Sequence, residues 1–355
     1  MPSNTQVPIV PPTMRAWVRS RRGPANTTLK LVSDHPTPAI PAASSSDVLI
    51  RVSHVSLQFS TEMTMKILPS LPFNSPWVPE IELSGEVVAA GDDAPAEMRN
   101  AGSHVVAFES VPSAIFMGRG VLAEYVRIPA CQVAHIDAGV DMASASGISG
   151  SGSVALRMIR TAGVREGHSV LVNGASGSVG SLLVQLCKLR GAKVVGIASG
   201  GNESLVRDLG VDEFIDYRRH DNLPAYLAHQ YGDRPFDFLL DCVGTQALFV
   251  NSPAYLEVDG AVINIGVFEG VFASARNALF NKWLPTWLGG VPRRYIIFST
   301  PPACDDVIYL ARLVEEGQLR IPVDSVFNME DAVGAYERIA TKRARGKVVV
   351  KIHGG

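Results

Sequence analysis

The sequence has few cysteines and no large excess of one charge, and each of these absences excludes a class of protein. Its four cysteines, Cys131, Cys187, Cys242 and Cys304, lie far apart and form no C-x-x-C pair. A chain of 355 residues does not need disulfide staples, so we expect reduced thiols in a cytoplasmic protein. The formal net charge of −2 provides no field to attract nucleic acid or an anionic membrane. Small-molecule partners are therefore expected.

Targeting and membrane signals are also missing from the sequence. Residues 1–13 lack a basic segment followed by an apolar run, so no secretory signal is expected. No apolar run approaches the roughly 20 residues that a membrane-spanning helix needs, and no membrane span is expected. The length fits about two domains, and a hydrophobic content of 46% is ample for two packed cores.

The most informative stretch is the one from Ser169 to Arg190. The apolar run at 170–172 leads into a glycine-rich turn and then into a segment with helical periodicity. The apolar positions of that segment are Val179, Leu182, Leu183 and Leu186. A second apolar run follows at 194–198. This order predicts a strand, a helix and a second strand, in which the turn can hold a pyrophosphate against the first amides of the helix.

The turn differs from the usual fingerprint at its first glycine. Ala175 stands there, so the pattern reads A-x-G-x-x-G. Gly177 would then allow close approach of the backbone to the pyrophosphate, and Gly180 would allow close packing of helix on strand. We predict dinucleotide binding at this turn.

Short strands dominate the first part of the chain, with runs rich in branched residues at 14–18, 47–53, 81–91, 104–108 and 123–128. Helical periodicity begins only near residue 141 and then alternates with apolar strands, which is typical of a doubly wound parallel sheet. We therefore predict an α/β protein. Its β domain comprises residues 1–140 and is rejoined by 318–355, and its dinucleotide-binding domain comprises 141–317.

Ordered matches over nearly the whole chain resemble the medium-chain dehydrogenase/reductase superfamily, in its zinc-independent branch of quinone-oxidoreductase-like and enoyl-reductase-like proteins. The matching segments are 48–52, 79–91, 120–126, 162–167, 209–217, 236–244, 316–319 and 344–350. The resemblance implies a GroES-like β domain, a Rossmann-type domain and a nicotinamide cofactor, NADPH, in a cleft between them. The cofactor residues that it implies are Gly174, Ala175, Ser176, Gly177, Ser178, Val179, Gly180, Ser199, Gly200, Asn202, Tyr217, Cys242, Val243, Gly244, Ile265, Gly266, Val267 and Lys342.

The resemblance also shows a missing metal site. Zinc-dependent relatives place a cysteine ligand where this chain has Gln58, and a Gly-His-Glu motif where it has Glu80-Ile81-Glu82. No cysteine precedes Cys131, so the structural zinc lobe is missing too. Zinc needs three or four converging N, S or O ligands, and we expect no metal.

Without a metal, reduction depends on positioning and on hydrogen bonds to the oxygen that gains charge, which favours acceptors activated by conjugation. By resemblance, Gln58, Ser60 and Ser153 line the site, and the Gln58 amide could donate to the acceptor oxygen. For Gln58, an ordinary hydrogen bond within a loop is an equally good interpretation. For Ser60 and Ser153, a surface or helix-capping role is as good an interpretation as a role in the site.

Three functions stay open. We expect an oxidoreductase that reduces a quinone or a free enone, partly because no tyrosine precedes Tyr125, where related enoyl reductases often have one as a donor. A carrier- or thioester-linked enoyl reductase of secondary metabolism that takes its proton from water is the alternative. A structural or interaction protein that binds NADPH without turnover is the third.

Three further predictions concern the second half of the chain. The apolar stretch 271–291 is interpreted as a helix that faces the core, with the wall of a substrate pocket as the alternative. The run 295–298 is expected to be the last strand of the sheet and to pair in a homodimer. Ser199, in place of an acidic residue, favours NADPH over NADH. Tyr217 and, from the tail, Lys342 and Arg343 are implied to reach its 2′-phosphate.

Overall fold

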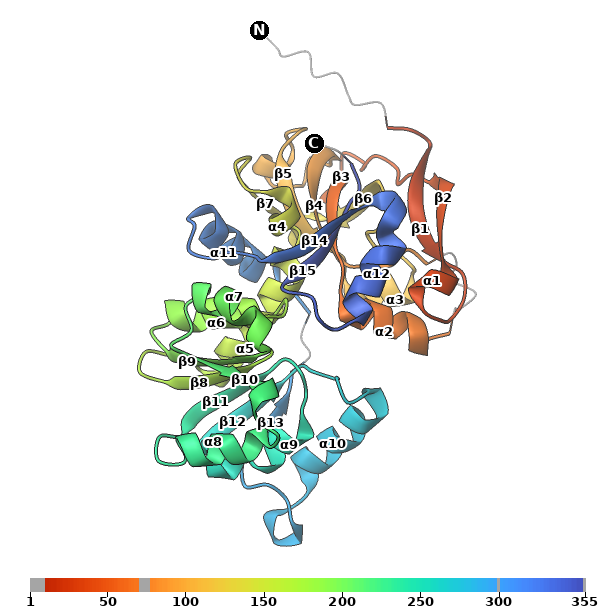
Figure 1. Ribbon diagram of the computed structural model, residues 1–355. Coiled ribbons are helices and arrows are strands. Elements are labelled where there is room, and N and C mark those ends of the chain that lie inside the picture. Colours follow the sequence, from red (N-terminus) through yellow and green to blue (C-terminus); the bar gives the residue numbers. More distant parts are fainter. Residues whose placement is uncertain (1–9, 70–76, 299–300, 354–355) are drawn as a thin grey trace. The chain divides into compact units, whose positions relative to one another are not determined.

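The chain forms two compact units in the computed structural model, which describes residues 10–69, 77–298 and 301–353 (Figure 1). One unit comprises Met1–Ser153 with Pro301–Gly355, and the other comprises Val154–Thr300. The domain borders predicted from the sequence, at residues 140 and 317, differ from the borders of these two compact units. The predicted borders stay a prediction. Among the described residues, no helix combines the length and the apolarity needed to cross a bilayer.

The first unit is built on a seven-stranded sheet with the order β14-β15-β3-β4-β5-β7, in which β6 also pairs with β3. Its strands are β3 (Asp47–Ser56), β4 (Glu82–Ala90), β5 (His104–Phe108), β6 (Tyr125–Pro129), β7 (Val133–His135), β14 (Val323–Asn328) and β15 (Lys347–Lys351). The pair β14 and β15 is parallel and the other pairs are antiparallel. A separate antiparallel pair is formed by β1 (Thr13–Arg19) and β2 (Leu29–Pro36). The predicted strands of this part are thus found, and the C-terminal tail rejoins them.

The first unit also contains helices before residue 141 that the sequence pattern did not predict. They include α1 (Ala25–Thr28), α2 (Phe59–Ile67) and α3 (Val111–Phe116). Its other helices, α4 (Met142–Ala145), α11 (Cys304–Glu315) and α12 (Ala332–Ala340), lie after residue 141, where helical periodicity was expected. The expectation of strands alone before residue 141 was wrong. The reason is visible in α2, whose buried residues are Thr61, Glu62 and Met65, so that polar side chains conceal the helical period.

The second unit is a six-stranded parallel sheet with the order β10-β9-β8-β11-β12-β13. The strands are β8 (Ser169–Asn173), β9 (Lys193–Ala198), β10 (Glu213–Asp216), β11 (Phe236–Asp241), β12 (Leu256–Asn264) and β13 (Arg294–Ile297). Its helices are α5 (Ser153–Ala162), α6 (Gly180–Leu189), α7 (Glu203–Asp208), α8 (Leu223–Tyr231), α9 (Gln246–Val250) and α10 (Val271–Trp283). This order is that of a Rossmann-type sheet and confirms the predicted α/β class.

Helix α6 buries the predicted apolar positions Leu182, Leu183 and Leu186 and packs against β8 and β9. Helix α10 behaves differently. None of its thirteen residues, all of which the structure describes, is buried. The interpretation of 271–291 as a helix that faces the core was therefore wrong.

Candidate functional site

The predicted cofactor residues of the second unit gather at one edge of its sheet. Because the strands are parallel, their carboxyl ends lie at the same edge, which is where open α/β sheets bind ligands. Gly174, Ala175, Ser176, Gly177, Ser178, Val179 and Gly180 follow β8; Ser199, Gly200 and Asn202 follow β9; Tyr217 follows β10; Cys242, Val243 and Gly244 follow β11; Ile265, Gly266 and Val267 follow β12. The fold thus collects five loops at the place where a dinucleotide would bind.

The glycines of the turn after β8 have different physical roles. Gly174 has a φ of 82°, in the left-handed region that favours glycine. A Cβ on Gly180 would lie 2.1 Å from the carbonyl oxygen of Gly174, so the turn closes only with glycine there. A Cβ on Gly177 would meet the same oxygen at 3.4 Å, an ordinary contact. The fold itself therefore requires Gly174 and Gly180, whereas the glycine at 177 leaves space for a ligand.

Ala175 is accommodated by a second glycine on the neighbouring strand. Its side chain is fully buried, and a Cβ on Gly196 of β9 would lie 3.2 Å from the Ala175 methyl group. The amides of Gly174 and Ala175 both donate to the carbonyl of Ile197, at 3.1 and 3.0 Å. The departure from the usual first glycine therefore leaves the turn anchored to β9.

The loops after β8, β9 and β10 contact one another. Asn202 Nδ2 donates to Ser176 Oγ at 2.8 Å, which ties the glycine turn to the loop after β9. A Cβ on Gly200 would lie 2.4 Å from Asp216 Oδ2, so that carboxylate rests against the loop. Position 199 thus has no acidic side chain, but the carboxylate of Asp216, at the end of the next strand, lies close to this loop.

Asp241, at the end of β11, organises the loop that follows it. Its buried carboxylate accepts from Asn173 Nδ2 at 2.8 Å and from the amides of Val243, Gly244 and Thr245 at 2.8 to 3.0 Å. Burial raises the pKa of this carboxyl group. Sequence reasoning missed Asp241 as a site residue, although an acidic residue that ends an apolar strand could have been noticed.

The loops after β11 and β12 touch through their backbones. A Cβ on Gly244 would lie 2.2 Å from the carbonyl oxygen of Gly266, and a Cβ on Gly266 would lie 2.0 Å from the carbonyl carbon of Val243. Asn264 closes the second loop, because its Oδ1 accepts from the Gly266 amide at 2.9 Å. These contacts fix the position of Ile265, Gly266 and Val267.

Gln58 and Ser60 lie together in the first unit. Gln58 is the residue before α2, and its Oε1 accepts from Ser60 Oγ at 3.2 Å. A Cβ on Gly150 would lie 2.6 Å from Gln58 Nε2, so the amide group lies over the π-helical turn Ile148–Gly152. The amide is therefore held in place by neighbours on both sides.

Ser153, the third predicted catalytic residue, follows that π-helical turn. It is buried, and its hydroxyl has no hydrogen-bond partner among the described residues. A buried hydroxyl without a partner costs free energy, and such groups recur at ligand sites.

The predicted cofactor residue Lys342 belongs to the first unit. It has a φ of 58°, and its ammonium lies 5.4 Å from the centre of the Phe59 ring. It is therefore not part of the five loops collected in the second unit, and its contact with the cofactor stays a prediction.

A buried ion pair that sequence reasoning missed supports the turn beside Gln58. Glu82 and Lys347 are buried and bonded to each other. Glu82 Oε2 also accepts from the amides of Gly150 and Ser151, at 2.6 and 3.3 Å, and Lys347 Nζ donates to Ser151 Oγ at 3.0 Å. The two residues are far apart in the chain, so no local pattern predicts their contact.

A second buried carboxyl group, Glu80, holds the start of α2. Its Oε2 accepts from the Gln58 amide at 3.1 Å, and its Oε1 accepts from the Tyr336 hydroxyl at 2.7 Å. Burial raises the pKa of Glu80 to about 8, so this group keeps its proton at neutral pH. Its φ of 69° is in the left-handed region.

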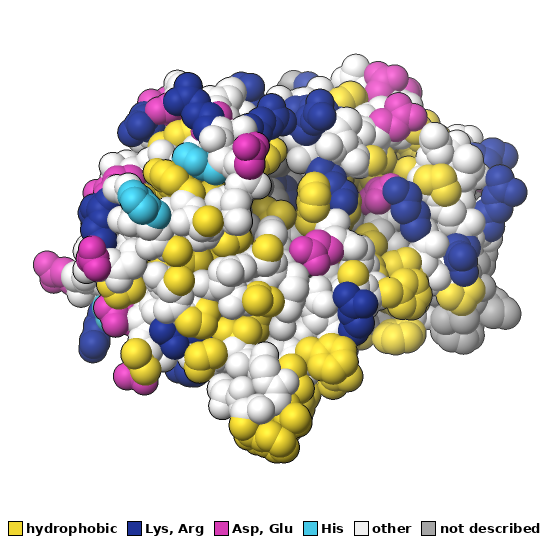
Figure 2. Space-filling view, turned by 60° about the horizontal axis from the view of Figure 1, so that its bottom comes forward, with side chains coloured by type: hydrophobic (Ala, Val, Ile, Leu, Met, Phe, Trp, Pro, Cys, Tyr) yellow, Lys and Arg dark blue, Asp and Glu magenta, His cyan; other side chains and the backbone are white. Residues whose placement is uncertain are grey.

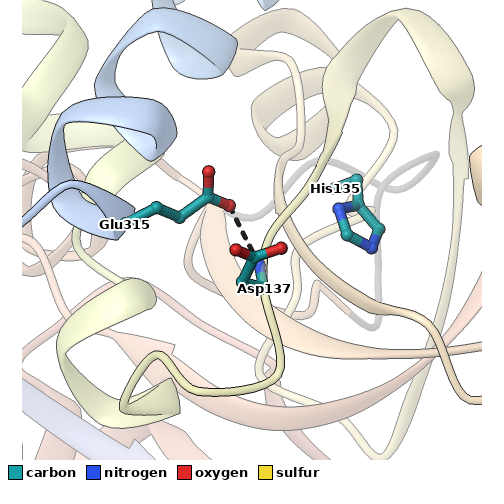
Figure 3. Close-up of side chains that lie close together, drawn as sticks. All are labelled: His135, Asp137 and Glu315. Carbon is teal, nitrogen blue, oxygen red and sulfur yellow. Dashed lines mark hydrogen bonds between the residues drawn. The ribbon is translucent and has the colours of Figure 1, made fainter.

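The residues in the zinc-ligand positions do not fit zinc. The side chain of Ile81 has no donor atom, the amide of Gln58 is a poor zinc ligand, and the carboxylate of Glu82 is engaged by Lys347. His135, Asp137 and Glu315 form another group of potential ligands, all within 4.8 Å of one another (Figure 3). All three are exposed, and Glu315 Oε1 accepts from the Asp137 amide at 2.9 Å. Exposed groups of this kind are common without an ion, and we assign no site to them.

Two family models match the chain. The model of the alcohol dehydrogenase GroES-like domain matches residues 44–138, and that of zinc-binding dehydrogenases matches residues 209–350. The chain is 46% identical to the medium chain reductase pydE of Acremonium sp, over 96% of this chain and 99% of that protein. It is 32% identical to the trans-enoyl reductase poxH of Penicillium oxalicum, over 96% of this chain and 98% of that protein. Among solved structures, the quinone oxidoreductase from Coxiella burnetii matches with a TM-score of 0.77 and 26% identity, over 96% of this chain and 100% of that one.

Proposed function

The chain belongs to the medium-chain dehydrogenase/reductase superfamily, and on that premise we propose that it reduces a carbon–carbon double bond conjugated with a carbonyl group, with NADPH as the cofactor. The observation that carries the proposal is the collection of five loops, all predicted to bind a dinucleotide, at the carboxyl edge of one parallel sheet. When bound there, the nicotinamide supplies a hydride. The relatives named as a medium chain reductase and a trans-enoyl reductase favour an enoyl group as the acceptor.

The first unit supplies the polar groups for such an acceptor. The Gln58 amide, fixed by Ser60 and Gly150, would donate a hydrogen bond to the carbonyl oxygen as it gains charge. The unpartnered hydroxyl of Ser153 is a second donor. Hydride addition to the β-carbon must be followed by a proton on the α-carbon, and we propose that water delivers it, because the Tyr336 hydroxyl is engaged by Glu80, which also accepts from the Gln58 backbone amide.

A quinone is the second candidate acceptor. The fold match to a quinone oxidoreductase supports it, and so does the proton chemistry, because a reduced quinone is protonated on oxygen, where exchange with solvent is easy. The same donors, Gln58 and Ser153, would serve the quinone oxygen.

The preference for NADPH rests on the loops after β9 and β10. Ser199 carries no negative charge to repel a 2′-phosphate, and Tyr217 is followed by two cationic residues, Arg218 and Arg219. Asp216 is engaged within its own loop, because it accepts from the Arg218 amide at 3.0 Å and lies 3.9 Å from Arg219. Two guanidinium groups against one carboxylate leave an excess positive charge, so we propose Arg218 and Arg219 as partners of the phosphate.

We further propose a zinc-independent reaction, a homodimer and a cytoplasmic location. The donor set at Gln58, Ile81 and Glu82 supports the first proposal. The free edge strand β13 supports the second. For the third, all four cysteines are free thiols, as a reducing compartment would keep them.

The experiment that tests the proposed function is anaerobic consumption of NADPH by the purified protein with enoyl thioesters, free enones and quinones. We expect turnover of the enoyl substrates and no change after dialysis against a chelator. Fastest turnover of quinones would select the second candidate, and activity restored only by zinc would refute metal independence. Tight binding of NADPH with no turnover of any acceptor would indicate the binding protein instead.

A further inference from the structure

Helix α10 presents its apolar side outward and its polar side to its own domain. Asn281 exchanges two hydrogen bonds with the Gln246 side chain, at 2.7 and 2.9 Å, and Asn277 Nδ2 donates to Glu269 Oε2 at 3.2 Å. On the other side, Phe272, Arg276, Leu279 and Trp283 follow one another at i, i+4, i+7 and i+11, the spacing of one helix face. All four are exposed, and Phe272 is 87% exposed. A surface helix of a globular domain normally has the opposite orientation.

The chain after the helix extends this apolar face into a fixed turn. Trp287 and Leu288 lie in the single helical turn η7 (Thr286–Leu288), and Trp287 is 80% exposed. The amide of Gly290 donates to the Pro285 carbonyl at 2.9 Å, and a Cβ on Gly290 would lie 1.9 Å from the Leu284 carbonyl oxygen. The turn is thus closed by a glycine and holds Trp287 outward. We call Phe272, Leu279, Phe280, Trp283, Trp287 and Leu288, with their flanking cations, the α10 surface.

The α10 surface carries an excess of positive charge, with the exposed Glu269 just before α10 as a nearby carboxylate. Residues 271–298 contain Arg276, Lys282, Arg293 and Arg294 and no Asp or Glu. Arg293 is turned back to the carbonyl of Leu256, whereas the other three cations are exposed. Lys282 Nζ lies 5.3 Å from the centre of the Trp283 ring. Figure 2 turns the lower part of the view in Figure 1, where α10 is drawn, toward the reader and shows hydrophobic side chains gathered over it. The local charge differs in sign from the net charge of the whole chain.

We propose that the α10 surface binds an anionic lipid bilayer. Exposed Trp, Phe and Leu next to Arg and Lys are the composition of helices that lie in the interface of a membrane, with the apolar side chains among the acyl chains and the cations at the headgroups. A protruding turn with an exposed tryptophan suits a bilayer, because the bilayer deforms around it. The protein would then be a peripheral reductase with access to apolar acceptors that partition into lipid.

The charges argue against a second copy as the occupant. A twofold contact made by the α10 surface would bring identical surfaces together, and residues 271–291 provide no carboxylate to pair with Arg276 or Lys282. An acidic partner protein would also pair with the cations. To bury the exposed tryptophans, however, the surface of that partner would have to match the shape of the turn at 286–288. Anionic lipid satisfies both requirements without a specific shape.

The test is flotation of the full-length protein with vesicles of phosphatidylcholine, with and without about one quarter phosphatidylserine. We expect binding to the anionic vesicles, weakened by added salt, with a blue shift of tryptophan emission. The shift can be assigned to Trp283 and Trp287, because the other two tryptophans, Trp17 and Trp77, are buried. Absence of binding to anionic vesicles at low salt would overturn the proposal.

Two variants and two matched controls complete the test. Trp283→Ser/Trp287→Ser and Arg276→Glu/Lys282→Glu should each lower the vesicle partition coefficient by about tenfold or more. Val258→Ser, which changes an apolar residue on β12 that is 76% exposed, and Arg22→Glu/Arg99→Glu, which reverses two exposed charges elsewhere, should bind as the wild type does. Equal binding by all variants would refute the proposal. The proposal would also be wrong if the tryptophan variant bound vesicles as the wild type does but had lost another interaction. That interaction could be a dimer, which would become a monomer, or a complex with an acidic protein.

Discussion

The Tyr336 hydroxyl donates to Glu80 Oε1 at 2.7 Å, and both side chains are buried. Glu80 and Glu82 are two buried carboxyl groups, and the ammonium group of Lys347 is the cation near both of them. If both were ionised, the interior would hold an uncompensated negative charge, which is costly in a medium of low polarity. The proton kept by Glu80 removes that charge. The start of α2, and with it Gln58, is thus held by a neutral carboxyl group.

This arrangement predicts a dependence of stability on pH. The pKa of Glu80 lies near 8 in the folded state and at its ordinary value of 4.5 in the unfolded chain. The folded state therefore binds more protons between these values, so this group makes the free energy of unfolding fall as pH rises from about 4.5 to about 8, by at most about 1.4 kcal/mol per pH unit. Glu80→Gln should lack that contribution. Urea unfolding of both proteins across this range measures the difference, and identical slopes would contradict the prediction.

The pair of Glu82 and Lys347 predicts a large effect of a single substitution. Lys347→Met leaves a buried carboxylate without its cation and should lower the free energy of unfolding by about 3 to 5 kcal/mol. Lys347→Met/Glu82→Gln should recover most of that loss, because neither buried charge remains. Chemical denaturation of the two variants and the wild type tests this. A double variant no more stable than the single one would show that the ion pair is not the cause.

The parts of the fold that could be predicted from the sequence are those set by residues close together in the chain. The face of α6 is set by its own apolar spacing, and Gly174 and Gly180 lie within one turn, so periodicity and the fingerprint found them. The contacts of Glu80 with Tyr336 and of Glu82 with Lys347 join residues 256 and 265 positions apart, and no pattern in either segment contains the partner.

Helix α10 shows a different limit. The apolar composition of residues 271–291 predicted a helix that faces the core, and the structure has a helix at Val271–Trp283. Composition does not say whether the apolar side chains point inward. Here Asn277 and Asn281 find polar partners on Glu269 and Gln246, and these contacts decide the orientation.

The cofactor loops predict a response to a substitution at the end of β9. Ser199→Asp should lower the affinity for NADPH by about tenfold or more, because the added carboxylate repels a 2′-phosphate, and should raise the relative affinity for NADH. Arg219→Ala should weaken binding of NADPH while leaving NADH nearly unchanged. Dissociation constants from the quenching of protein fluorescence measure both. Equal affinity of the wild type for the two cofactors would show that these loops do not select the phosphate.

The free edge of the second sheet predicts a dimer. Strand β13 pairs only with β12 in the described sheet and ends with Ile297, which is exposed. Pairing of β13 with its copy would satisfy the unpaired backbone groups of the edge. We expect a dimer in sedimentation velocity at micromolar concentration and a shift to monomer in Ile297→Lys, whereas Val258→Lys should stay dimeric. A monomeric wild type would refute the prediction.

Gly177 and Gly180 predict that ligand binding can be separated from folding within one turn. A methyl group on Gly177 meets only an ordinary contact at 3.4 Å within the protein, so Gly177→Ala should keep its thermal stability within about 2 °C of the wild type. The same methyl group would occupy the space in which the pyrophosphate must approach the backbone, and the affinity for NADPH should fall by about tenfold or more. Gly180→Ala, whose methyl group would lie 2.1 Å from the Gly174 carbonyl oxygen, should lose both stability and binding. Thermal unfolding and fluorescence titration of the two variants distinguish the roles, and unchanged NADPH affinity in Gly177→Ala would mean that the dinucleotide does not bind at this turn.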